Sequence, residues 1–255
     1  MNDRIKKLRE QSLGSINCIS PERAILVTEF YRSGIDNEVS VPVMRALAFK
    51  HILKNKYICI NERDLIAGER GPAPKAVPTY PEICLHSLED LKILDMRPKV
   101  SFKVDEATKL AYKDLIIPFW KGKSNRDRIM RSMTPEWTDA YLAGIFTEFQ
   151  EQRAPGHTVC GGMIYNKGML DLMKDIQEAE DHVDFFNDPK AYDKAEELKA
   201  MKIAANALID YAERHAEKLL YLATQEKNGE RKEELEKMAA ICRRVPAYEI
   251  GRAHV

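Results

Sequence analysis

One stripe of apolar residues constrains the fold of this chain more than any other feature. Between residues 188 and 225 these side chains recur every three or four positions: Ala195, Leu198, Met201, Ala205, Leu208, Ala212, Ala216, Leu219 and Ala223. This spacing places them on one face of a single long helix, which begins near Asp188-Pro189 and ends near Gln225. Alanines let neighbouring helices approach closely. The chain is therefore predicted to be mainly α, with this helix packed against others.

Further helices are predicted wherever a capping side chain or a proline precedes an apolar run. They begin at Ser20-Pro21, Pro42, Ser87, Asp105, Thr134-Pro135-Glu136 and Arg231. The first is expected to bury Ala24, Val27 and Tyr31. The second is expected to bury Met44, Leu47, Ala48 and Ile52. The helix from Asp105 runs to about Trp120, with Pro118 bending its end.

Short strands and one ordered loop separate some of these helices. Residues 57–60 and 65–67 are short apolar runs between polar breaks, which favours brief strands. Two glycines and four prolines between Gly68 and Pro81 exclude a regular helix or a central strand there. Val77 and Tyr80 are unusual in a linker, so this segment is predicted to be an ordered loop on a larger body.

Composition excludes several classes of protein. Forty basic and forty acidic residues give no electrostatic footprint for nucleic acid or an anionic membrane. There is no apolar run long enough to span a bilayer and no hydrophobic signal core at the start, so a cytoplasmic location is expected. The five cysteines are scattered without CxxC spacing, which indicates neither a disulfide framework nor a zinc site.

The segment most suggestive of chemistry runs from Phe146 to Gly162. A polar, helix-compatible run stops at Ala154-Pro155-Gly156, and His157 follows in a loop with Gly156, Gly161 and Gly162. Proline disfavours helix at the residue before it, and glycines permit close backbone approaches. Such a loop can hold His157 against a ligand, where an imidazole can exchange protons near neutral pH.

The chain resembles glycyl radical enzymes of the pyruvate formate-lyase superfamily, in particular the trans-4-hydroxy-L-proline dehydratase group. The resemblance runs from about Ile19 to Ala247, and the Gly156-His157 loop belongs to it. Its other landmarks are Ser20-Pro21-Glu22-Arg23-Ala24, Val41-Pro42-Val43-Met44-Arg45-Ala46-Leu47, Asp64-Leu65-Ile66-Ala67-Gly68-Glu69, Pro78-Thr79-Tyr80-Pro81-Glu82 and Met133-Thr134-Pro135-Glu136-Trp137.

The resemblance implies a fold and a reaction. The family fold is a ten-stranded α/β barrel, and this segment would supply its N-terminal, mainly helical part and one wall of the substrate cavity. A glycyl radical, installed by a separate S-adenosylmethionine/[4Fe-4S] activase, would oxidise a relay cysteine to a thiyl radical. The thiyl would abstract a hydrogen atom from a small hydroxylated substrate such as trans-4-hydroxy-L-proline. A homodimer is expected for the full-length enzyme. No bound cofactor, metal, nucleic acid or membrane is expected for this segment.

The resemblance also ranks the candidate site residues. His157 is expected to contact the substrate, and Phe149 is expected to form one wall of the substrate cavity. A phenylalanine that only packs in the core is nearly as good an interpretation of Phe149. Cys160 near His157 could suggest a thiol hydrolase, but no third orienting residue is evident, so packing is preferred. Arg214 has the fork that a carboxylate substrate wants. Leu220 stands where the family's carboxylate-binding arginine is expected, which puts hydroxyproline itself in doubt.

Other polar residues are given structural roles. Glu69, Arg70 and Tyr80 are expected to bond the proline-rich loop to the body, and Arg153 to fix the Gly156 loop. His51, His86, His182 and His215 have neighbours typical of helix surfaces and receive no function.

The chain is expected to be a fragment. The family's relay cysteine and radical glycine lie far downstream, so both would fall beyond Val255 and no catalytic residue is assigned here. Residues 1–248 are interpreted as the N-terminal part of the pyruvate formate-lyase domain. Residues 249–255 match the translation of a common sequencing adapter and are interpreted as non-native.

Two alternatives remain open from the sequence. Within the superfamily, the chain could belong to a formate C-acetyltransferase that acts on pyruvate and coenzyme A. In a different class, it could be a non-catalytic helical interaction module.

Overall fold

The computed structural model describes residues 2–35, 38–146 and 160–250. The helices are α1 (Asp3–Gly14), α2 (Glu22–Arg32), α3 (Val41–Asn55), α4 (Leu88–Met96), α5 (Glu106–Ala111), α6 (Ile117–Trp120), α7 (Asn125–Ser132), α8 (Pro135–Leu142), α9 (Met169–Asp181), α10 (Ala191–Gln225) and α11 (Gly229–Arg244). Two further turns are η2 (Tyr112–Ile116), a π-helix, and η3 (Gly161–Tyr165), a 3₁₀-helix. The strands are β1 (Cys18–Ser20) and β2 (Ala76–Pro78). The predicted mainly α class is confirmed.

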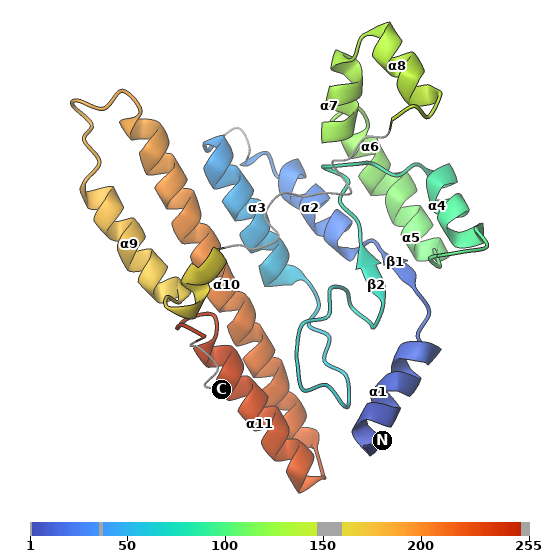
Figure 1. The fold of residues 1–255 in the computed structure, drawn as a ribbon, viewed down its shortest axis with the longest axis vertical. Helices are drawn as coiled ribbons and strands as arrows, with labels where there is room; N and C mark the ends of the chain where they lie inside the picture. Colours follow the sequence, from blue (N-terminus) through green and yellow to red (C-terminus); the bar gives the residue numbers. More distant parts are fainter. Residues whose placement is uncertain (1, 36–37, 147–159, 251–255) are drawn as a thin grey trace.

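The helices form a fan around α10 (Figure 1). With 35 residues, α10 is about 52 Å long at the rise of an α-helix. It packs against α3 and α9 over one part of its length and against α11 over another. Helices α4 to α8 lie at the opposite side of the fan, beyond α2. None of the described helices is long and apolar enough to cross a membrane.

The helix starts predicted from capping residues are largely confirmed. Ser87 and Asp90 form a reciprocal capping box at α4, and Asp105 accepts the Thr108 N–H at 2.7 Å before α5. Thr134 caps α8 as predicted. The last helix, α11, begins at Gly229, two residues before the predicted Arg231, because Asn228 accepts the Arg231 N–H. Ser20 differs slightly, because it ends β1 and reaches only the Glu22 N–H, at 3.4 Å.

The predicted strands at 57–60 and 65–67 are wrong. Neither segment has strand structure, although Ile58 and Cys59 are buried. The observed strands pair in parallel, with Ile19 opposite Val77. Thus the proline-rich segment 68–81 supplies β2, and its prediction as an ordered loop on a larger body is confirmed. Burial alone does not make a strand, since a strand also needs a backbone partner.

The core beside α2 is organised by buried polar bonds at the π-helix. The Tyr112 hydroxyl donates to Thr79 Oγ1 at 2.6 Å, and Trp120 Nε1 donates to Thr28 Oγ1 at 2.8 Å. Pro118 has no N–H to donate, and the turn before it widens so that the Ile117 N–H bonds Tyr112 O. Burial raises the pKa of Tyr112 to about 12, against the lowering effect of its bond to Thr79.

The apolar stripe of α10 is partly as predicted. Ala205, Ala216, Leu219 and Ala223 are buried, but Met201 is 53% exposed. The helix changes neighbours along its length, so its buried face rotates instead of following one line. In α3 the buried residues are Val43, Ala46 and Ala48, with the predicted Met44, Leu47 and Ile52 only partly buried. Two opposite sides of α3 are covered, by α2 and by α10.

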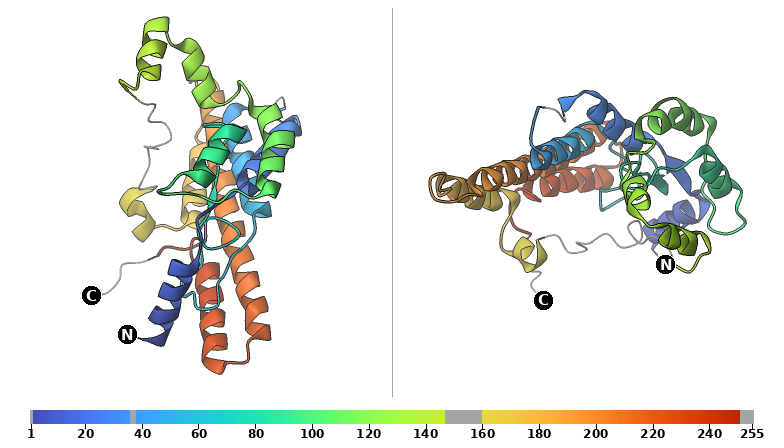
Figure 2. Two further views of the ribbon diagram at one scale, coloured as in Figure 1. Left: turned by 90° about the vertical axis from the view of Figure 1, so that its right-hand side faces the viewer. Right: turned by 90° about the horizontal axis from the view of Figure 1, so that it is seen from above.

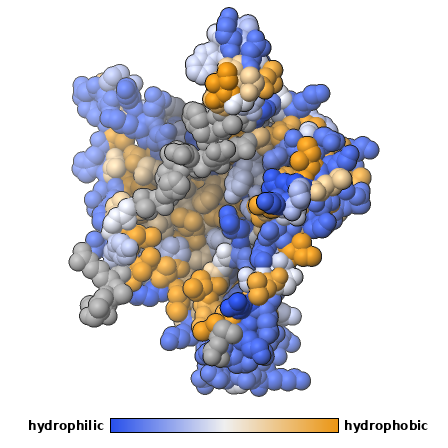
Figure 3. Space-filling model, turned by 45° about the vertical axis from the view of Figure 1, so that its right-hand side comes forward, coloured by the Kyte–Doolittle hydropathy of each residue, from blue (hydrophilic) through white to orange (hydrophobic). Residues whose placement is uncertain are grey.

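We expect the 255-residue chain on its own to be helical by circular dichroism, to bind hydrophobic dyes and to self-associate. Ile66 is 88% exposed and Ile145 78%, and apolar side chains gather in a recess on one face (Figure 3). Large exposed apolar patches drive association. Dye fluorescence and light scattering check this. A monodisperse chain with a sharp cooperative melt would instead indicate a self-sufficient domain.

Candidate functional site

His157 and Phe149, the two residues expected to contact the substrate, lie outside the described residues, as does Arg153. The structure does describe the chain on both sides of this segment. Helix α8 and Phe146 lie before it, and Cys160, η3 and α9 lie after it.

An aromatic cluster precedes the segment. The Phe146 ring lies 5.1 Å from Trp137 and 5.9 Å from Tyr141, measured between centroids. Tyr141 is tied back to α7, because Arg126 donates to its hydroxyl at 2.8 Å. Trp137 belongs to the landmark that opens α8. The position of Phe146 is thus fixed by rings spaced four residues apart on one helix face.

The chain after the segment begins with a tight left-handed turn. Cys160 and Gly161 have φ angles of 65° and 50°, a region that favours glycine. Cys160 is a free, partly exposed thiol. The interpretation of Cys160 as a nucleophile paired with His157 is not tested, because His157 lies outside the described residues.

A backbone clamp holds the start of α9, and sequence reasoning missed it. The first N–H groups of α9 donate to the chain near the end of α11: Met169 N to Pro246 O at 2.9 Å and Leu170 N to Ala247 O at 3.0 Å. A Cβ added at Gly168 would lie 2.3 Å from Ala247 O. The close contact between α9 and residues 246–248 therefore requires glycine at position 168. In the sequence, this contact was marked only by a glycine directly before an apolar run.

Arg214 does not offer its fork to a ligand. Its two terminal nitrogens donate to the carbonyls of Leu53, and of Lys56 at 2.8 Å, at the end of α3. These carbonyls have no partner within α3, so Arg214 joins α10 to that helix. Leu220, where an arginine was expected, is partly buried against the cluster of Ala216 and Leu219.

Two of the family landmarks meet at Arg23. Its guanidinium forms a two-point ion pair with Glu82, donates to Thr79 O at 3.2 Å and lies 3.9 Å from the centre of the Tyr80 ring. The nearby Glu22 accepts the Tyr57 N–H at 2.7 Å. Tyr80 therefore contacts the body through its ring and not through the expected hydrogen bond, and both landmarks have a structural role.

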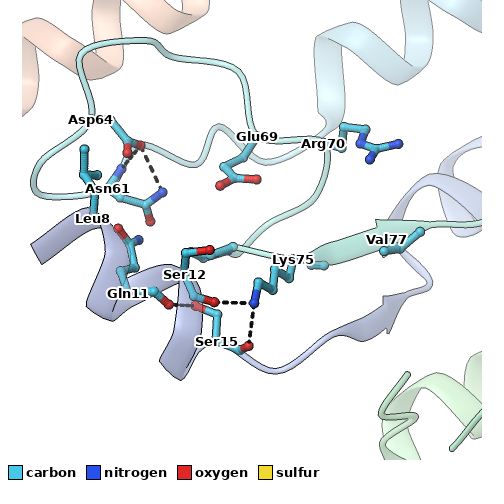
Figure 4. A pocket seen from close by; sticks show the side chains of 12 residues that line it. Leu8, Gln11, Ser12, Ser15, Asn61, Asp64, Glu69, Arg70, Lys75 and Val77 are labelled. Carbon is cyan, nitrogen blue, oxygen red and sulfur yellow. Dashed lines mark hydrogen bonds between the residues drawn. The ribbon is translucent and has the colours of Figure 1, made fainter. Parts of the chain in front are cut away.

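The proline-rich loop also borders a polar pocket of about 370 Å³ (Figure 4). Lys75 donates across it to the backbone oxygens of Ser12 and Ser15, the latter at 3.2 Å. Glu69 is directed toward the pocket and Arg70 away from it. Because Lys75 donates to the carbonyls at the end of α1, it connects the proline-rich loop to α1. The pocket therefore lies at a structural contact between these two segments.

One histidine differs from its prediction. His215 is only 6% exposed, instead of lying on a helix surface. Its Nδ1 lies 2.9 Å from Tyr211 O, so this nitrogen carries the proton and donates. Burial lowers the pKa of His215 below 6.5, outweighing the hydrogen bond, which raises it; Lys56 and Arg214 lower it further.

The burial of His215 gives a pH dependence of stability. Below about pH 6.5 the unfolded chain binds the proton more readily than the folded chain, so the free energy of unfolding should fall as the pH drops through this range. We expect His215→Asn to reduce this fall between about pH 7.5 and 5.5, measured by urea unfolding. Equal pH slopes for the two chains would contradict the assignment.

Comparison with known proteins gives a consistent result. A family model described as pyruvate formate lyase-like matches residues 1–249. The trans-4-hydroxy-L-proline dehydratase of Clostridioides difficile is 48% identical over 99% of this chain and 32% of its own length. Its crystal structure with trans-4-hydroxy-L-proline bound superposes with a TM-score of 0.92, covering 98% of this chain and 31% of that one. The B12-independent glycerol dehydratase of Clostridium butyricum gives 0.87 at 29% identity, over 98% and 32% of the two chains. The chain thus spans about a third of the length of these relatives.

Proposed function

Because this chain belongs to the pyruvate formate lyase-like family, we propose that it is part of a glycyl radical dehydratase acting on a small hydroxylated substrate such as trans-4-hydroxy-L-proline. The observation that carries the proposal is 48% identity to a hydroxyproline dehydratase across 99% of the chain. A family member that dehydrates glycerol is only 29% identical. The activity belongs to a whole protein of which this chain is the N-terminal part.

In this proposal, the described residues hold one wall of the substrate cavity. The aromatic cluster at Phe146 and the clamp at Gly168 fix the two ends of the segment that carries Phe149 and His157. His157 gives a proton to the leaving hydroxyl, which departs as water. Phe149 covers the substrate and excludes solvent.

The radical would be supplied from outside this segment. A glycyl radical, installed by a separate S-adenosylmethionine/[4Fe-4S] activase, would supply the oxidising equivalent to a relay cysteine, and the resulting thiyl radical would abstract a hydrogen atom from the substrate in the whole enzyme. Among the described residues, no group of three or more His, Cys, Asp and Glu side chains could hold a metal ion. These residues do not fit an iron–sulfur cluster, and the proposal places it on the activase. The whole enzyme is a cytoplasmic homodimer in this proposal.

The substrate is tested with the whole protein, activated anaerobically by its activase. Loss of trans-4-hydroxy-L-proline with formation of a dehydrated product is the expected result. Glycerol and the pair pyruvate and coenzyme A serve as competing substrates. Turnover of pyruvate with coenzyme A, and none of hydroxyproline, would replace the proposal by a formate C-acetyltransferase.

We expect the genomic reading frame to continue after about Tyr248. The continuation should encode a mid-chain cysteine followed shortly by a glutamate, and a glycine in an arginine-rich motif near its C-terminus. Residues 249–255 should be absent from it, as a translated adapter would be. Sequencing the locus from its source checks this, and an uninterrupted native frame that ends at Val255 would refute it.

A further inference from the structure

The chain between Cys160 and α9 is held by a succession of short-range backbone hydrogen bonds. Cys160 O accepts the Met163 N–H at 3.0 Å, and Met163 O accepts the Lys167 N–H at 2.9 Å. Gly168 follows directly and is the N-cap of α9. Because these bonds succeed one another without a break, the position of Cys160 depends on the position of Gly168.

The clamp at Gly168 fixes this stretch to the end of α11. Figure 2 shows the chain that follows α11 passing the start of α9, where Met169 N and Leu170 N donate to it. A Cβ added at Gly168 would meet the backbone of both Ala247 and Tyr248 within 2.4 Å. Every one of these contacts lies within the described chain. They therefore do not depend on what covers this segment in the whole protein.

The two supports of the segment that carries His157 differ in reach. His157 stands three residues before Cys160, and three residues of chain span at most about 11 Å. It stands eleven residues after Phe146, and eleven residues can span up to about 40 Å. The support on the side of Gly168 therefore restricts the position of His157 much more than the aromatic cluster does.

We propose that Gly168 is a positioning residue for His157, because the clamp on the end of α11 sets, through η3, where the proton is delivered. This role rests on the proposed function, in which His157 gives a proton to the leaving hydroxyl, and it names the residue that keeps the acid in place. A misplacement of about 1 Å can lower a rate by about 100-fold. Since the proton is needed in the transition state, the loss falls on kcat and not on KM.

The test is Gly168→Ala in the whole protein, activated anaerobically, with kcat expressed per glycyl radical counted by electron paramagnetic resonance. We expect kcat for trans-4-hydroxy-L-proline to fall about 30-fold and KM to change by less than about threefold. Counting radicals corrects for protein that has not folded or has not been activated. Gly229→Ala adds a Cβ that meets no atom within 4 Å, and it should leave both constants unchanged.

Met169→Pro weakens the clamp without adding bulk at Gly168. Proline has no N–H, so the bond to Pro246 O is lost, while proline suits the first position of a helix, which Met169 occupies. Gly168, with φ −93° and ψ 179°, already has an extended backbone, as a residue before proline needs. Met169→Ala keeps the N–H and reproduces the loss of the buried side chain. We expect kcat of Met169→Pro to lie about tenfold below that of Met169→Ala.

A double-mutant cycle separates positioning from a general structural role. If Gly168 acts through His157, Gly168→Ala should cost less than about twofold in kcat when position 157 is already alanine. A general loss of structure would lower kcat by the same factor in both backgrounds, so that the two losses would multiply.

Wild-type kcat in Gly168→Ala, equal kcat in Met169→Pro and Met169→Ala, a loss confined to KM, or losses that multiply in the cycle would each overturn the proposal. The first of these results includes the case where another part of the whole protein holds His157. If Gly168→Ala yields no folded protein, the two variants at Met169 decide. A wild-type enzyme that forms the radical but does not consume the substrate would instead refute the proposed function, so the two failures are distinguishable.

Discussion

In the activated whole enzyme, His157→Ala is expected to lower kcat/KM for trans-4-hydroxy-L-proline by about 100-fold or more. A positioned general acid contributes roughly 10²- to 10⁴-fold to a rate, and hydroxide is a poor leaving group without a proton. Most of the loss should appear in kcat, because the proton is needed in the transition state. Steady-state kinetics under anaerobic conditions measure this.

His182→Ala is the matched control. His182 is an exposed histidine at the end of α9, whose Nδ1 lies 2.6 Å from Glu178 O, and its loss should leave the kinetics unchanged. If His157→Ala retains wild-type kcat/KM while the glycyl radical forms normally, His157 does not act on the substrate.

Gly168→Ala is expected to release the clamp at the start of α9, at a cost of about 3 kcal/mol. The new Cβ would lie 2.3 Å from Ala247 O and 2.4 Å from the Tyr248 backbone, and backbone atoms cannot move away as a flexible side chain can. The hydrogen bonds from Met169 N and Leu170 N would be lost with it. Hydrogen exchange at these two amides should speed up by about 100-fold, since about 1.4 kcal/mol corresponds to each factor of ten.

Gly229→Ala provides the comparison for the clamp. Gly229 is the first residue of α11, and an added Cβ would meet no atom within 4 Å. Alanine favours a helix over glycine by about 1 kcal/mol, so exchange there should slow slightly or stay unchanged. Equal exchange at Met169 and Leu170 in wild type and Gly168→Ala would show that the close approach does not hold α9.

Local signals in the sequence were sufficient for several helices, whereas α1, α7 and α9 were not predicted. Ser87, Asp105 and Thr134 act as caps because the bonds they make lie within three residues. The length of α10 also followed from its own spacing. Such features require no knowledge of the rest of the fold.

Features that depend on distant residues were not predictable. The pairing of β1 with β2 joins residues nearly sixty positions apart, and neither strand has an apolar alternation. Arg214 looked free for a ligand until α3 placed two carbonyls beside it. His215 looked exposed because its neighbours in sequence are polar, whereas its burial comes from the packing of α10.

In the candidate site, too, some features could be predicted from the sequence and others required the structure. Phe149 was identified by resemblance, and His157 by its glycine-rich loop together with the resemblance. The described residues add the supports on both sides of them. The Gly168 clamp required the structure, because the carbonyls of Pro246 and Ala247 arrive from the far end of the chain.

The most direct test of the central claim is an electron paramagnetic resonance spectrum of the whole protein after anaerobic treatment with its activase and S-adenosylmethionine. A glycine-centred radical is expected from the whole protein, and no such signal from the 255-residue chain treated in the same way. A whole protein that forms no glycyl radical, yet still dehydrates its substrate, would contradict the assignment.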